Sequence, residues 1–187
     1  MRRTTSKKDP VIAWMLLGIP ILFIVASPLH FVFEWTGGNI FAGLFAPVNE
    51  SVWEHLKLTF WPLLVWWIFG YLLFHKAGNW SFKSFVVTGA LAEFTCALFI
   101  VAFFYTYTGA LGIESLILDI ISLLLGLVVG ILTAVHFYRF KRPGSMAALI
   151  ATLVLFVMAA AFLYFTFYPP HLPIFMDPPT GTYGIGH

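Results

Sequence analysis

The sequence predicts an all-α integral membrane protein with about five transmembrane helices, from its composition, its apolar stretches and the spacing of its basic residues. Of the 187 residues, 60% are hydrophobic and only 10% are charged, whereas an ordinary globular domain has about 25% charged residues. A soluble fold still exposes about a third of its surface, so it could not hide this much apolar area. Soluble, disordered and collagenous classes are therefore excluded. The single cysteine, Cys96, excludes an intrachain disulfide.

Each expected helix is an apolar stretch near the length of about 20 residues that a bilayer requires. The chain forms one transmembrane domain over residues 1–187, with expected spans at about 11–33, 58–75, 84–107, 115–138 and 145–168. The apolar stretch 37–48 is too short to cross, so we expect an interfacial or re-entrant segment there. The tail 169–187 is rich in proline but too apolar for a solvated linker. We expect this tail to be irregular and to pack back over the outer face.

Basic residues predict the orientation, because cytoplasmic loops carry an excess of Lys and Arg. With a cytoplasmic N-terminus, nine of the ten fall inside: Arg2, Arg3, Lys7, Lys8, Lys76, Lys83, Arg139, Lys141 and Arg142. Only Lys57 falls on the outer side. The tail is then extracytoplasmic.

The stretch before the second span is the most informative part of the sequence. Ser51 and Glu54 fit a capping box that starts a helix. We expect Glu50 and Glu54 to lie one turn apart on one face, where like charges are destabilising. A bound cation, Lys57 or a raised pKa of one carboxyl would relieve this repulsion. Together with the adjacent His55, these two carboxylates are ligands that suit a divalent metal such as Zn, Mn or Fe. The alternative is a capped, charged helix start at the membrane surface.

The fourth span carries a narrow stripe of small and polar residues. Its members recur every three or four positions, so they fall within about 60° of one another: Asp119, Ser122, Gly126, Gly130 and Thr133. Small residues let another helix approach closely, so this Gly126/Gly130 seam could dock a second copy or a membrane partner. Packing does not explain Asp119, which we expect one turn below the outer surface.

Glu93 lies near the middle of the third span. A charged side chain at that depth costs about 2.5–3.5 kcal/mol on insertion scales, so it needs a partner or a proton. The functional hypothesis is an intramembrane relay, and the alternative is a structural hydrogen bond.

Topology brings most of the polar residues to the outer side. We expect a binding site formed from Asn49, Glu50, Glu54, His55, Glu93, Asp119, His171 and Asp177. Its metal-ligating candidates are Glu50, Glu54, His55 and Asp119. The residues leave the cofactor open, with a divalent metal ion as the candidate. His30 also falls on this side, but a lone histidine there is typical of a hydrogen-bonded surface residue.

The residues are compatible with three different functions. The first is binding of a cation or small polar solute for transport or sensing. The second is a metal-dependent hydrolase that acts on a lipid or lipid-linked substrate. The third is a scaffold subunit. The chain has no P-loop and no G-x-S-x-G, H-E-x-x-H or C-x-x-C motif, and its scattered basic residues give no nucleic-acid footprint.

Two outer motifs carry a resemblance to a known group. The segment Asn-Glu-Ser-Val-Trp-Glu-His-Leu-Lys (49–57) and the tail from Pro-Pro-His-Leu-Pro to Tyr-Gly-Ile (169–185) resemble small multi-pass membrane proteins of Gram-positive bacteria. That group is catalogued as a domain of unknown function. The resemblance implies a bacterial cytoplasmic membrane and brings no activity with it.

Overall fold

The computed structural model describes residues 9–76 and 80–185. In order, its helices are α1 (Pro10–Trp35), α2 (Ile40–Gly43), α3 (Val52–His55), α4 (Lys57–Phe74), α5 (Phe82–Leu111), α6 (Leu116–Phe140), α7 (Ser145–Phe165) and the 3-10 turn η1 (Pro173–Phe175). Within these residues there is no strand, and five helical stretches are long and apolar enough to cross a membrane. The predicted all-α membrane class is confirmed.

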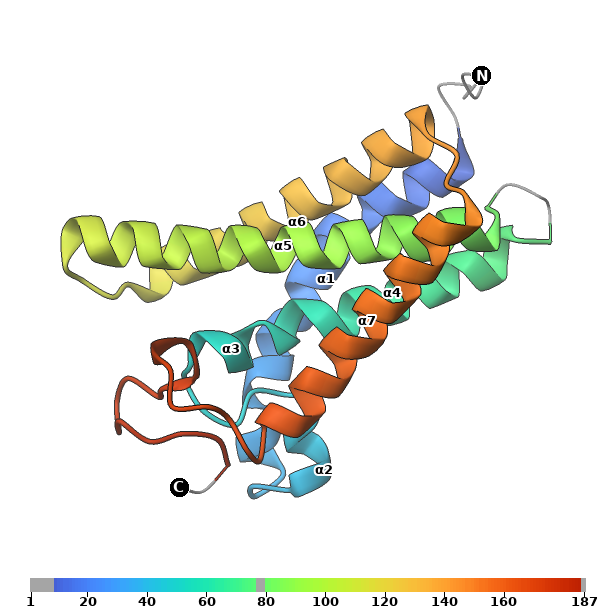
Figure 1. The fold of residues 1–187 in the computed structure, drawn as a ribbon. Coiled ribbons are helices and arrows are strands. Elements are labelled where there is room, and N and C mark those ends of the chain that lie inside the picture. Colours follow the sequence, from blue (N-terminus) through green and yellow to red (C-terminus); the bar gives the residue numbers. More distant parts are fainter. Residues whose placement is uncertain (1–8, 77–79, 186–187) are drawn as a thin grey trace.

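Helix α5 forms the centre of the bundle, since it packs against α4, α6 and α7, while α1 packs against α4 and α6. Figure 1 shows α5 and α6 as a long antiparallel hairpin whose connecting turn lies at the same end of the molecule as α3 and the tail. The helices lie together at one end of the molecule and spread apart at the other. The candidate site lies at the end where they spread.

The glycine seam of α6 packs inside the chain. A Cβ added at Gly130 would lie 2.5 Å from the Ala92 carbonyl oxygen, and one at Gly126 would lie 2.8 Å from Ile100 Cγ1. Both neighbours belong to α5, so the small residues allow close approach of α5 and α6. The expectation that this seam docks a second copy or a partner is thus corrected: α5 of the same chain fills it.

A tryptophan pair fixes α1 against α4. Trp14 and Trp66 stack with ring centroids 4.0 Å apart, and each indole Nε1 donates to the other residue's backbone carbonyl at 3.2 Å. Glycines permit this contact, because a Cβ at Gly18 would lie 2.7 Å from the Trp66 indole. This packing sets the register in which the end of α1 lies beside α3.

The segment 37–48 contains no helix long enough to cross a membrane. Gly37 and Gly38 adopt positive φ angles of 67° and 77°, which turn the chain after α1. The four-residue helix α2 follows, capped by the Asn39 side chain. Its Phe41 is 76% exposed, and the interfacial or re-entrant placement of the segment stays a prediction.

The tail packs back onto the start of the second span, as the sequence predicts. Asn49 Nδ2 donates to the Gly184 carbonyl at 3.2 Å, and the Ile185 amide donates to the Thr166 carbonyl at 2.9 Å. Phe175 also packs against Trp53, with ring centroids 4.9 Å apart.

The orientation in the membrane stays a prediction. Four basic residues on which it rests, Arg2, Arg3, Lys7 and Lys8, lie outside the described residues.

Candidate functional site

The N-cap of α3 decides where the two neighbouring glutamates point. Ser51 Oγ accepts the Glu54 amide at 3.3 Å, so the helix begins at Val52 and Glu50 precedes it. The expectation that Glu50 and Glu54 share a helix face is therefore corrected. Their carboxyl groups lie in two separate networks.

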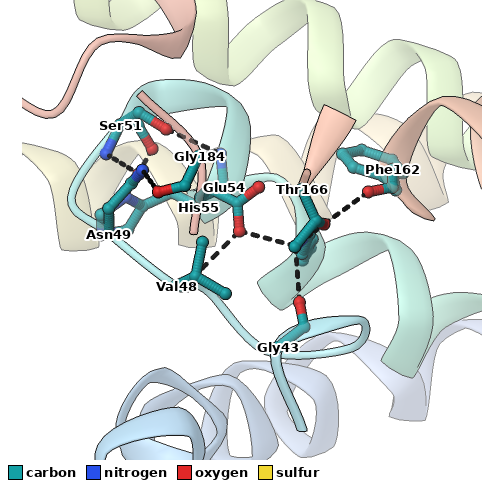
Figure 2. A network of polar contacts seen from close by, with 10 residues as sticks. Gly43, Val48, Asn49, Ser51, Glu54, His55, Phe162, Thr166 and Gly184 are labelled. Carbon is teal, nitrogen blue, oxygen red and sulfur yellow. Dashed lines mark hydrogen bonds and ion pairs between the residues drawn. The ribbon is translucent and has the colours of Figure 1, made fainter. Parts of the chain in front are cut away.

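Glu54 belongs to a buried ion pair. Its Oε2 lies 2.6 Å from Lys57 Nζ and also accepts the Val48 amide at 3.1 Å. Lys57 uses its remaining two donors on the Gly43 carbonyl at 2.8 Å and Thr166 Oγ1 at 2.7 Å. Figure 2 shows this network joining the α2 loop, α3, α4 and the end of α7. Lys57 therefore neutralises Glu54, which lies outside the cluster of histidines and Glu50 described next.

Glu50 instead faces two histidines. Its Oε2 lies 3.4 Å from His55 Nε2 and 3.6 Å from His30 Nε2, and the two Nε2 atoms lie 3.0 Å apart. The Glu50 side chain is half-exposed, while both imidazoles are mostly covered. Its interactions with His30, and next with His55, hold the pKa of the Glu50 carboxyl well below its usual range. We call these three residues the His/Glu triad.

A backbone carbonyl orients the His55 ring. Its Nδ1 lies 2.9 Å from the Ser51 carbonyl oxygen, which can only accept, so Nδ1 carries a hydrogen. In the neutral ring the Nε2 lone pair then points towards His30 and Glu50. This is the arrangement that orients metal-ligating histidines in proteins, where the second ring nitrogen donates to a carbonyl or carboxylate.

The triad has the dimensions of one face of a tetrahedral metal site. With metal–ligand bonds of about 2.0–2.1 Å, the ligand atoms of tetrahedral zinc lie about 3.3 Å apart. The three observed separations are 3.0, 3.4 and 3.6 Å. Two imidazoles and a carboxylate also match the ligand chemistry of catalytic zinc and of non-haem iron. The three side chains can therefore hold a divalent ion with at least one open position.

A pocket of about 500 Å³ adjoins the triad. Four parts of the chain form its walls: α1, the segment 50–58, the facing ends of α5 and α6, and the tail. Its polar lining residues are Ser27, His30, Glu50, His55, Glu114, Ser115, Asp119 and Ser122. The apolar ones include Phe23, Phe31, Leu58, Ile100, Phe104, Leu116, Ile120, Leu123, Pro178 and Pro179.

The structure brings Asp119 to this pocket but not into the triad. Its Oδ1 accepts the Tyr107 hydroxyl at 2.8 Å, which fixes the carboxylate on the α6 wall. Asp177 is buried and positions Glu50 from the tail, because its Oδ1 accepts the Glu50 amide at 2.8 Å. Asn49 stabilises the same loop, since its Oδ1 accepts the Ser51 amide at 3.0 Å.

Two further candidates lie apart from the pocket lining. His171 packs against Tyr183 in the tail, with ring centroids 4.5 Å apart and the ring planes tilted by 31°. Glu93 is buried in α5, and its Oε1 has no hydrogen-bond partner among the described residues.

His30 is the candidate ligand that the sequence analysis did not include. The available signal was its place near the end of α1, on the same predicted side as the 49–57 motif. It became a candidate ligand only once the packing of α1 placed it 3.0 Å from His55.

The comparisons with known proteins give a family without an activity. A model described as "Family of unknown function (DUF6512)" matches residues 1–185, in agreement with the resemblance seen in the sequence. No curated protein and no solved structure matches the chain.

Proposed function

Since the chain belongs to this family of unknown function, DUF6512, we propose a function from the geometry of its site: a membrane-embedded, metal-dependent hydrolase. The single observation that carries this proposal is the spacing of the His/Glu triad, whose three ligand atoms fit a tetrahedral divalent ion. Structural zinc sites close all four positions with protein ligands, whereas catalytic sites keep one open. A three-ligand set beside a pocket favours the catalytic kind.

The residues around the triad suit hydrolysis. A bound divalent ion lowers the pKa of a coordinated water to about 7, which supplies a nucleophile at neutral pH. Asp119 lines the same pocket and is held by Tyr107, so it is the candidate to accept the proton of that water. His30, Glu50 and His55 hold the ion, and the Ser51 carbonyl keeps the His55 ring in place.

Transport of a cation is less well supported. A path through the membrane needs polar groups at successive depths, and Glu93 is the candidate for an intermediate binding site. Glu93 does not line the pocket that adjoins the triad. The geometry therefore favours chemistry at the triad over passage through the chain.

Metal analysis of the purified protein tests the site. We expect about one equivalent of tightly bound divalent metal per chain, and its loss in His30→Ala and Glu50→Gln. The matched controls are His171→Ala and Glu34→Gln, which remove a histidine and an exposed carboxylate outside the triad. Equal metal content in triad variants and controls would contradict the site.

A chromogenic ester such as 4-nitrophenyl butyrate tests the activity. We expect metal-dependent hydrolysis that Glu50→Gln abolishes and Glu34→Gln keeps. Hydrolysis that continues unchanged after a chelator is added would contradict the metal-dependent hydrolase. The metal site itself would still be tested by the metal analysis.

We further propose that the protein resides in a bacterial cytoplasmic membrane with the triad on the extracytoplasmic side. The distribution of Lys and Arg supports this orientation. Reporter fusions after residues 80 and 185 should lie inside and outside respectively. If both reporter fusions lie on the same side of the membrane, the proposed orientation is contradicted.

A further inference from the structure

The pocket beside the triad changes character with depth. On α1 it is lined by His30 near the helix end and by Phe23 seven residues earlier, about 10 Å along the axis. On α6 it is lined by Asp119 in the first turn and by Leu123 one turn further in. On both helices the ionisable lining residue therefore lies towards the triad end, whereas the lining residues deeper in the bundle are apolar or, at Ser27 and Ser122, small hydroxyls. An amphiphile has the same change in polarity along its length, from a polar head group to an apolar chain.

One wall of the pocket is continuous with the apolar outer surface. Phe31, Leu116 and Ile120 line the pocket, and they are 45%, 74% and 48% exposed. In a membrane-spanning helix such exposed apolar side chains face the lipid chains. A lipid can therefore reach the pocket sideways from the bilayer without passing through water.

The polar end of the pocket is acidic beyond the triad. Glu114 and Asp119 line it, and its described lining contains no lysine or arginine. The nearby Lys57 has all three donors engaged in the buried network. A head group with a negative charge meets two carboxylates there, whereas an uncharged or cationic head group does not.

We propose that this pocket binds an acyl lipid with an uncharged or cationic head group, whose chain lies towards Phe23 and Leu123. The lipid carbonyl oxygen then takes the open position of the triad metal. That carbonyl contact rests on the proposed function, whereas the fit of the chain rests on the pocket alone. The volume of about 500 Å³ is typical of small-molecule sites, which span roughly 300–1,000 Å³.

Two single-chain lipids of equal chain length test the proposal. The probes are 1-monopalmitoylglycerol, which is uncharged, and palmitoyl lysophosphatidylglycerol, which is anionic. The full chain is first stripped of metal with a chelator, so that Zn²⁺ does not itself attract the phosphate. Binding to this metal-free chain in detergent is measured by isothermal titration calorimetry. We expect the uncharged lipid to bind roughly tenfold more tightly. Equal affinities, or a preference for the anionic lipid, would overturn the head-group assignment.

A pair of tryptophan substitutions on α6 tests the position of the chain. Leu123→Trp fills the pocket, whereas Leu125→Trp adds the same bulk to a residue that is 38% exposed and does not line it. We expect Leu123→Trp to weaken monopalmitoylglycerol binding at least roughly tenfold and Leu125→Trp to leave it unchanged, with metal content retained in both. Equal binding by the two variants would overturn the proposal.

Wild-type protein loaded with Co²⁺ provides a second measurement, in case Leu123→Trp does not fold. Monopalmitoylglycerol should change the visible Co²⁺ spectrum, because its carbonyl enters the coordination sphere. An unchanged spectrum would overturn the carbonyl contact.

The two proposals fail in different ways. If the protein holds one metal ion but binds neither lipid, the lipid inference is overturned and the metal site stands. If it holds no metal but binds monopalmitoylglycerol in a way that Leu123→Trp weakens, the proposed function fails and the chain pocket stands.

Discussion

Glu50 and Glu54 are four residues apart, yet their carboxylates lie in opposite kinds of environment. Glu54 is buried and has its charge matched by Lys57, whose other donors are also satisfied. Glu50 is half-exposed, and its partners are two imidazoles whose protonation and ligands can change. The first network can only hold structure together, whereas the second can exchange a proton for a metal ion.

The two networks are connected through the backbone. The Glu54–Lys57 pair fixes the segment between α2 and α4, and that segment carries Glu50 and His55 at its other face. A buried pair in which Lys57 uses all three of its donors thus provides the rigid support that a three-ligand site needs to hold its geometry. The comparison predicts that damage to the first network reduces stability, while damage to the second reduces binding.

The largest expected effect is on stability, from Lys57→Met. This substitution leaves the Glu54 carboxylate buried without its cation, which typically costs about 3–5 kcal/mol. The free energy of unfolding can be measured by SDS titration in mixed micelles. Lys83→Met is the matched control, since Lys83 is exposed and donates only to Ser145 Oγ among the described contacts.

A double variant separates charge from packing. Glu54→Leu with Lys57→Met removes both charges, so it should recover most of the stability lost by Lys57→Met alone. If Lys57→Met is no more harmful than Lys83→Met, the network does not support the fold as we argue.

The second effect concerns stabilisation by metal. Zn²⁺ at a hundredfold excess over its dissociation constant should stabilise the wild type by about 2.7 kcal/mol. Glu50→Gln should lose this stabilisation by Zn²⁺. Glu54→Gln should be less stable than the wild type without metal but should still be stabilised by Zn²⁺. Thermal melts with and without Zn²⁺ measure both. A gain that depends on Glu54 rather than Glu50 would reverse the comparison.

The sequence predicted the helices well, because their signal is a run of about 20 apolar residues that needs no tertiary context. It also identified the 49–57 motif and the return of the tail. It did not separate Glu50 from Glu54, because that depends on whether the helix begins before or after Ser51.

Two other features depend on which helices are neighbours. The small residues Gly126 and Gly130 predict close approach of some helix, but only the fold shows that α5 provides it. His30 is 25 positions from His55, and no local pattern joins them. Packing of α1 against α4 creates that pair, so the sequence alone could not assign His30 as a ligand.

The third effect is a pH dependence of metal binding. The lowered pKa of Glu50 keeps its carboxylate ionised throughout the range in which histidines titrate. A metal-bound imidazole nitrogen must be unprotonated, so protons compete with the metal at the two histidines of the triad and the affinity should fall as the pH decreases. Between about pH 7.5 and about pH 5.5 we expect a roughly ten- to hundredfold loss, measured by competition with a chelator. A constant affinity would indicate that histidines are not ligands.

The smallest effect links the tail to the triad through Asp177. Its Oδ1 accepts the Glu50 amide, and its Oδ2 accepts the Thr180 hydroxyl, so this side chain holds Glu50 in place without belonging to the triad. Asp177→Ala should lower metal affinity about tenfold, the lower range for the loss of an orienting partner. Asp177→Asn keeps an acceptor oxygen for the Glu50 amide and should restore most of that affinity. His171→Ala, which alters the tail away from Glu50, should bind metal as the wild type does. If Asp177→Ala also binds like the wild type, Glu50 holds its position without the tail, and the triad is more independent of its surroundings than we infer.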